Sequence, residues 1–191
     1  MAKGTERIQG EICPMKIIHV NLGLPSGTLW ADRNLGANKP EELGNYFRFG
    51  EVIPFTKESG EYEYPYPTDN IAGTENDAAT HNLGKPYKMP SIEQLKELFS
   101  ICKKQWTSQN GVAGCKLTGP NGNSIFLPAS GLRLGVGDAG MVADIGSFGF
   151  YWSATLNYYE NYGKNLYFDS ACWYDITNAR SEGRSVRPVL G

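Results

Sequence analysis

The stretch FYWSATLNYYENYGKNLYFDSACWYDITNARSEGRSVRP, residues 150–188, decides how the whole chain is interpreted. Its interior mixes tyrosine and tryptophan with asparagine, serine and aspartate, and two flanking segments, residues 150–155 and 184–188, enclose that interior. Tyrosine and tryptophan offer large, rigid contact areas, while serine and asparagine offer adaptable hydrogen bonds, a combination typical of recognition surfaces. The alternative is a tyrosine-rich sheet whose rings pack on the core of the domain.

The order of residues within this stretch favours a surface over a core. Apolar residues recur at period two and are expected to point inward: Leu166, Phe168, Ile176 and Val186. Their neighbours are expected to face solvent: Tyr167, Asp169, Asp175 and Thr177. Four exposed rings of ~150–250 Å² each would exceed the ~300–600 Å² apolar patch of a typical monomer. The stretch therefore predicts a ligand-binding surface formed by Asn157, Tyr158, Tyr159, Asn161, Tyr162, Asn165, Tyr167, Asp169, Ser170, Ala171, Trp173, Tyr174, Asp175, Thr177, Asn178 and Ser181.

Length and charge narrow the class of protein. The chain has 191 residues and a formal net charge of -2, which fits one acidic domain of ordinary size. No run of lysine and arginine is interleaved with aromatic residues, so a nucleic-acid partner is not expected. No apolar stretch is long enough to span a membrane, and the start MAKGTERIQGE lacks the apolar core of a signal peptide. We expect a leader at residues 1–15 and a single domain at residues 16–191.

The residues that usually carry catalysis or bind metals are sparse. The chain has four cysteines and two histidines, without a Cys-x-x-Cys pair: Cys13, Cys102, Cys115, Cys172, His19 and His81. This spacing indicates neither a zinc site nor a disulfide framework, and most thiols are expected to be reduced. No acidic segment has the EF-hand pattern of a calcium site. The sequence therefore predicts no catalytic residue, no metal and no cofactor.

The scaffold is expected to be α+β, with many short strands and one or two helices. Ser91 and Gln94 form a capping-box pattern at the start of a helix over residues 91–103. Its apolar residues fall on one face: Ile92, Leu95, Leu98, Phe99 and Cys102. A shorter helix is expected at residues 77–82. Strands are expected at residues 17–20, 28–31, 45–52, 112–118, 124–127, 150–155, 165–169, 173–177 and 184–189, whereas glycine-rich residues 131–149 exclude a long regular element.

Several motifs resemble a known family. They are VNLGLPSGTLWADRNLGA (residues 20–37), NYFRFGEVIPFT (45–56), YKMPSIEQLKELF (87–99), WTSQNGVAGCKLTGPNGNSIFLPASGLR (106–133), FGFYWSAT (148–155) and GRSVRPV (183–189). Their order resembles the Fibrobacter succinogenes major paralogous domain family, common in Bacteroidetes and their phages. The resemblance implies a C-type lectin-like fold, similar to that of formylglycine-generating enzymes, with a variable ligand-binding region at about residues 150–189.

The C-terminal pattern also resembles the variable proteins of diversity-generating retroelements. In those systems a reverse transcriptase substitutes bases at template adenines, so that AAY asparagine codons become many residue types between two invariant segments. The resemblance implies invariant segments at residues 151–155 and 183–189. It also implies a protein or glycan receptor on a target cell surface, display on a phage virion or bacterial cell surface, and the option of a homo-oligomer.

Two other functions remain open at the level of sequence. One is a surface lectin or adhesin without programmed diversification, although no Glu-Pro-Asn or Trp-Asn-Asp triplet for calcium-dependent sugar binding is present. The other is an enzyme of the formylglycine-generating type, although no evident cysteine pair supports that activity.

Overall fold

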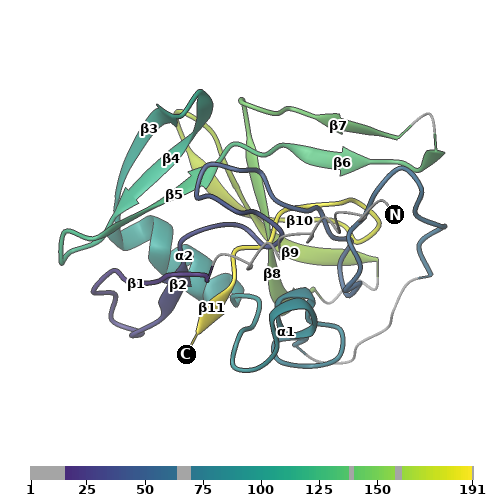
Figure 1. Cartoon of the computed structure of the whole chain (residues 1–191), viewed down its shortest axis with the longest axis horizontal. Coiled ribbons are helices and arrows are strands. Elements are labelled where there is room, and N and C mark those ends of the chain that lie inside the picture. Colours follow the sequence, from purple (N-terminus) through teal and green to yellow (C-terminus); the bar gives the residue numbers. More distant parts are fainter. Residues whose placement is uncertain (1–15, 64–69, 138–139, 158–160, 191) are drawn as a thin grey trace, which may run out of the picture.

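The computed structural model describes residues 16–63, 70–137, 140–157 and 161–190. These residues form a mixed α+β fold of short antiparallel strands in small sheets, with two helices (Figure 1). The predicted fold class is confirmed at this level. The predicted leader at residues 1–15 lies outside the described residues. No helix in the described ranges is long and apolar enough to cross a membrane.

Both helices begin at a side-chain cap. Helix α1 spans Ala78–Leu83, and the Asp77 carboxylate accepts hydrogen bonds from the first backbone N–H groups of the helix. Helix α2 spans Ile92–Ile101, and Ser91 and Gln94 form the predicted capping box, with bonds of 3.1 and 2.9 Å. Helix α2 ends two residues before the predicted boundary, because the chain enters a strand at Lys103.

The strands form four sheets, in which every strand pair is antiparallel. Strands β1 (His19–Asn21), β2 (Leu29–Ala31) and β11 (Val189–Leu190) form one sheet, in the order β1-β2-β11. Strands β3 (Lys103–Gln109), β4 (Val112–Thr118) and β5 (Ser124–Pro128) form the second. Strands β6 (Leu132–Leu134) and β7 (Met141–Ala143) form a hairpin. Strands β8 (Gly149–Leu156), β9 (Tyr162–Phe168) and β10 (Trp173–Ala179) form the fourth, in the order β10-β9-β8.

Some sequence predictions of strands are wrong. Residues 45–52 do not form a strand and contribute only an isolated bridge between Phe47 and Arg184. Residues 184–189 form isolated single-residue bridges with several different segments, and a regular strand begins only at Val189. Strand β3 was not anticipated, since its sequence KKQWTSQ lacks an apolar run. It forms through its hairpin with β4, whose turn places Asn110 at φ 48° and Gly111 at φ 83°.

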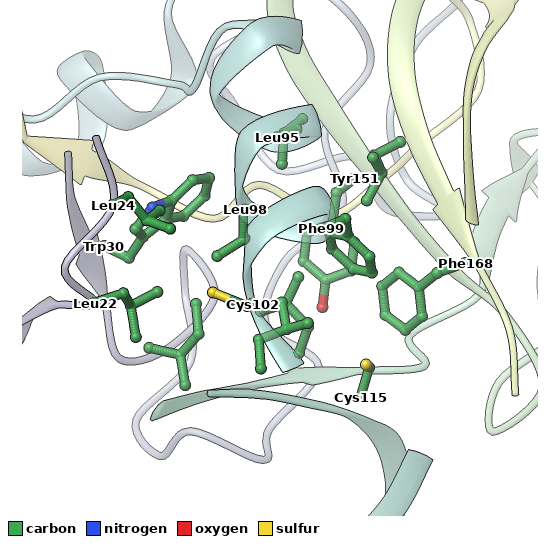
Figure 2. Packing of buried hydrophobic residues seen from close by; sticks show 14 of the residues in the cluster. Leu22, Leu24, Trp30, Leu95, Leu98, Phe99, Cys102, Cys115, Tyr151 and Phe168 are labelled. Atoms are coloured by element: carbon green, nitrogen blue, oxygen red, sulfur yellow. The ribbon is translucent and has the colours of Figure 1, made fainter. Parts of the chain in front are cut away.

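Helix α2 lies at the centre of the main core cluster. Figure 2 shows Leu22, Leu24 and Trp30 on one side of the helix and Tyr151 and Phe168 on the other. The predicted apolar face of α2 is buried, and Leu95 and Leu98 have no exposed surface. A second cluster packs α1 and the loop residues Phe47 and Phe49 against Trp152 and Val186. The sheet β8–β9–β10 therefore has one face on α2, and part of its other face on the second cluster.

Candidate binding surface

Strand register decides which side chains share a face of the sheet β8–β9–β10. Directly opposite residues in antiparallel strands lie on the same face. Phe150, Tyr167 and Tyr174 are opposite one another across the three strands, as are Tyr151, Leu166 and Asp175 on the alternate face. Tyr151 and Leu166 belong to the core around α2. We call the side with Phe150, Tyr167 and Tyr174 the outer face.

Four aromatic rings form a continuous row on the outer face. We call Phe148, Phe150, Tyr167 and Tyr174 the aromatic row. The Tyr167 centroid lies 5.5 Å from Phe148, 5.4 Å from Phe150 and 6.3 Å from Tyr174, and the last pair is stacked with planes 16° apart. Tyr174 is 57% exposed, and the other three rings are half-buried. These separations are in the range of favourable aromatic pairs, so the row forms a preorganised apolar surface open to solvent.

The carboxylate of Asp169 connects the row to the loop between β9 and β10. It accepts a 2.6 Å hydrogen bond from the Tyr167 hydroxyl and bonds of 2.7 and 2.8 Å from the backbone N–H groups of Ala171 and Cys172. These donors lower the pKa of Asp169 to about 2, with the Tyr167 bond as the largest contribution. Desolvation and the same bond raise the pKa of Tyr167 to about 12. The Asp169 carboxylate therefore holds the loop in place by accepting hydrogen bonds from groups of the protein itself.

A buried arginine lies beneath the row. The Arg184 guanidinium is 5.4 Å from the Phe150 ring centroid and 4.5 Å from that of Trp152. It has no exposed surface, and its Nη2 donates a 2.6 Å hydrogen bond to Glu182. Burial lowers the pKa of Arg184, and Glu182 opposes that shift. The Phe150 ring of the row is thus supported from beneath by a cation–π contact with a buried guanidinium.

The predicted site residues separate into groups. Those exposed to solvent are Asn161, Tyr162, Ser170, Ala171, Tyr174, Asp175 and Thr177. Those half-buried are Asn157, Tyr167, Asp169, Trp173, Asn178 and Ser181. Tyr158 and Tyr159 lie outside the described residues. The exposure predicted for Asp175 and Thr177 is confirmed.

The prediction that Asn165 belongs to the exposed surface is wrong. Asn165 has no exposed surface, and its Nδ2 donates to the Ile176 carbonyl and to Asn178 Oδ1 at 3.2 and 3.0 Å. It lies opposite Trp152 at the end of the outer face where Phe49 also packs. Its amide therefore ties β9 to β10 in the interior.

The prediction of one common surface is also wrong for part of strand β10. The turn at residues 169–172 places Asp175, and not Ile176, opposite Leu166. Trp173, Asp175 and Thr177 consequently share the face that packs on α2, and the Trp173 ring lies 5.8 Å from that of Phe99. Asp175 and Thr177 remain exposed, and Lys96 of α2 contacts the Asp175 carboxylate at 3.3 Å.

Two members of the row were not in the predicted site. Phe148 and Phe150 were assigned to the glycine-rich segment and to the flanking segment. Their spacing in Phe148-Gly149-Phe150 is the period-two signal that could have placed both rings on one face. Gly149 lies between them because a Cβ at this position would approach the Phe168 ring to 2.2 Å.

Cavities of ligand size are not formed by the rings of the row. A cavity of about 540 Å³ is lined by Arg48, Glu51 and Ile53, among others. A cavity of about 250 Å³ under the β9–β10 loop is lined by Phe99 and Trp106 and by four of the predicted site residues, Asp169, Ser170, Ala171 and Trp173. No residue of the aromatic row lines either cavity. Within the described residues, no group of histidine, cysteine and acidic side chains is arranged to hold a metal ion.

Comparison with known proteins gives a family. A model described as "Domain of unknown function (DUF8237)" matches residues 94–189, which include most of α2, the aromatic row and the loop of Asp169. No curated protein and no solved structure matches the chain. Because the matched residues make up half of the 191-residue chain, the protein belongs to the DUF8237 family.

Proposed function

We propose that this chain is a ligand-binding variable protein of a diversity-generating retroelement, with a C-type lectin-like fold and a receptor-recognition surface on the outer face. The aromatic row is the observation that carries the proposal. One exposed ring and three half-buried rings lie side by side, and a contiguous apolar patch of this kind marks an interaction site. Aromatic side chains are also the residues that most often dominate binding energy at protein interfaces.

The burial of the flanking segments supports the variable-protein part of the proposal. Residues 151–154 and 183–189 are all buried, whereas most described residues between them are exposed or half-buried. A surface that must accept many sequences needs its stability from elsewhere, and exposed substitutions usually change stability by only about ±0.5 kcal/mol. The cores around α2 and Trp152 supply that separate stability.

The form of the row favours a protein receptor over a small molecule. Small-molecule sites are concave and enclose most of the ligand. The row runs across three neighbouring strands and lines neither of the cavities described above. Such a face suits a partner that contributes a broad surface of its own.

A binding experiment tests the surface. The labelled full chain is incubated with cells and envelope fractions of Bacteroidetes, and retention is compared with that of Tyr174→Ala and Tyr167→Phe. We expect Tyr174→Ala to reduce retention at least tenfold without a change in fold, because hot-spot rings cost about 2 kcal/mol or more when truncated. Lys57→Ala, an exposed change away from the row, is the matched control. If Tyr174→Ala and Tyr167→Phe were both retained as well as the wild-type chain and Lys57→Ala, the row would have no role in binding.

The nucleotide sequence around the gene tests diversification separately. The proposal requires a nearby second copy of the segment encoding residues 150–189 that differs mainly at adenines, together with a reverse transcriptase gene. Retention that depends on Tyr174, without such a copy, would instead identify a surface lectin or adhesin of fixed sequence. A glycan array probed with the wild-type chain and Tyr174→Ala would then separate sugar from protein ligands.

Thiol chemistry gives the enzymatic alternative little support. An enzyme of the formylglycine-generating type needs reactive cysteines, and thiolates are the reactive form. Desolvation and the adjacent Asp169 carboxylate raise the pKa of Cys172, and burial raises the pKa of Cys115 to about 11. Both shifts disfavour the thiolate at neutral pH.

A further inference from the structure

Strand β10 is an edge strand whose free side carries unpaired backbone groups. In the sheet order β10-β9-β8, β10 has a neighbour on one side only. The opposite edge of the sheet is closed, because Ser185 of the flanking segment bonds to β8 through Trp152 N–H at 3.0 Å and to the Phe150 carbonyl at 3.2 Å. The β8 edge of this sheet is therefore covered by the flanking segment, whereas β10 has a strand on one side only.

The hydrogen-bond alternation identifies which groups point away from β9. Asp169 N donates to Cys172 O at one end of the hairpin, and Arg180 N donates to Asn161 O at the other. Antiparallel pairs alternate between bonded and non-bonded positions, so the backbone groups of Trp173, Asp175 and Thr177 face the free edge. Among the described residues, no backbone group outside the sheet forms a hydrogen bond with the N–H or C=O groups of these three.

This edge has few of the features that usually prevent strand addition. Natural edge strands are protected by proline, charged side chains, bulges or very short length. Strand β10 has the sequence WYDITNA, and it pairs with β9 in uninterrupted register over all seven residues. Asp175 is its only charged side chain, and Lys96 of the same chain contacts that carboxylate.

We propose that the free edge of β10 pairs antiparallel with β10 of a second copy of this chain, about a twofold axis at Ile176. Ile176 is the midpoint of the strand, so this register pairs β10 along its whole length. Asp175 of each copy then lies opposite Thr177 of the other, and the two residues exchange both backbone hydrogen bonds. The Thr177 hydroxyl can also donate to the facing carboxylate. The inference stands independently of what the aromatic row binds.

The side chains of β10 favour a twofold axis at Ile176 over an axis at Asp175 or Tyr174. A twofold axis at Asp175 would place two carboxylates directly opposite each other, which is destabilising. An axis at Tyr174 would move the end of the partner strand past the loop at residues 169–172 and leave Thr177 unpaired. An axis at Ile176 places two apolar side chains opposite each other instead.

The dimer would join two sheets into one. Strand pairing across the axis makes a continuous sheet in which the outer faces of both copies lie on the same side, because opposite residues share a face. Ile176 lies on the outer face together with Tyr174. Two aromatic rows would therefore be presented together, and a bivalent surface gains avidity without any new contact to the receptor.

Cysteine cross-linking tests the axis directly. In the proposed register the two Ile176 Cα atoms form a non-bonded pair about 4.5 Å apart, within the range that a disulfide spans. We make Ile176→Cys in the full chain with Cys13 and Cys172 replaced by serine. Tyr174→Cys in the same background is the matched control, because its two copies would lie roughly 13 Å apart along the strands. We expect disulfide-linked dimers from Ile176→Cys alone under mild oxidation; equal cross-linking of both variants would overturn the axis.

A proline substitution tests the edge in the reduced protein. Thr177→Pro removes an N–H that faces the free edge, and does not remove a bond to β9. Sedimentation of the wild-type chain should show concentration-dependent dimers. Thr177→Pro should weaken association at least about tenfold, whereas Thr177→Ala should retain it. A single-chain mass at every concentration, or a dimer unaffected by Thr177→Pro, would overturn the proposal. If Thr177→Pro fails to fold, the cysteine pair decides.

Discussion

The flanking segments and the stretch that they enclose use similar residues in opposite ways. Residues 183–189 contain two arginines and a serine that are fully buried, whereas the tyrosines and aspartates of β9 and β10 are exposed or half-buried. Arg187 shows the difference most clearly. Its guanidinium donates to Asn34 Oδ1, Ala31 O and Phe126 O at 3.0, 3.1 and 2.7 Å, and so connects three distant parts of the chain. Polar chemistry therefore serves the scaffold in one region and is available for recognition in the other.

We expect substitutions at Arg187 to change the free energy of unfolding the most. Replacement by methionine leaves three buried acceptors without a donor, and each costs about 1–3 kcal/mol. We expect Arg187→Met to destabilise the chain by at least about 3 kcal/mol, measured by urea unfolding. Arg187→Lys should also destabilise it, since an ammonium cannot reproduce the planar arrangement of donors. A loss below about 1 kcal/mol for Arg187→Met would show that the flanking segment does not hold the scaffold together.

Two adjacent residues of β9 are expected to show the next largest difference in stability when they are substituted. Phe168 is buried against Phe99 and Tyr151, whereas its neighbour Tyr167 lies in the aromatic row. We expect Phe168→Ala to cost about 3–5 kcal/mol, typical of a deleted core ring. Tyr167→Phe keeps the ring and should cost less than about 1.5 kcal/mol. Denaturant midpoints of the two variants measure the difference, and equal losses would contradict the assignment of the two faces.

Gly163 tests whether the enclosed stretch contains fixed positions of its own. A Cβ at this position would lie 2.6 Å from the Phe49 ring and 3.0 Å from that of Trp152. We expect Gly163→Ala to destabilise the chain by about 1–3 kcal/mol, the usual cost of overpacking. Ser170→Ala, an exposed change in the same stretch, is the matched control. Calorimetry of both variants would separate them, and an unchanged Gly163→Ala would allow this position to vary.

Features that depend on residues close together in the sequence were predicted correctly more often than features that depend on contacts between distant residues. The cap of α2 was predictable because Ser91 and Gln94 act on each other three residues apart. The burial of Asn165 was not, since it depends on Phe49 and Trp152 packing at the same end of the outer face. The face of Ile176 was also misassigned, because period two alone does not give the change of phase at the β9–β10 turn. The sequence thus anticipated that Tyr167 faces away from the core, whereas the register of the strands decides which residues share its face.

The pH dependence of the loop is the smallest predicted effect on stability. The pKa of Asp169 is about 2 in the folded chain, below the ~3.9 of a free aspartate. Its contribution is therefore present above pH ~4 and is lost as the pH falls through about 2. The Tyr167 hydroxyl has its pKa raised to about 12, so its contribution is present below pH ~10 and is lost as the pH rises through about 12.

Substitution of the carboxylate separates this effect from general acid unfolding. Asp169→Asn can still accept from the Ala171 and Cys172 N–H groups through its Oδ1, but it removes the charge and replaces the oxygen that accepts from the Tyr167 hydroxyl. We expect its tyrosine absorbance titration to show one group moved to lower pH, and its loop amides to exchange faster, with the global unfolding free energy changed by less than about 1.5 kcal/mol. An unaltered titration would mean that Tyr167 is held by desolvation alone. In that case the aromatic row is positioned by its ring contacts, and the Asp169 carboxylate is not needed to hold Tyr167 in place.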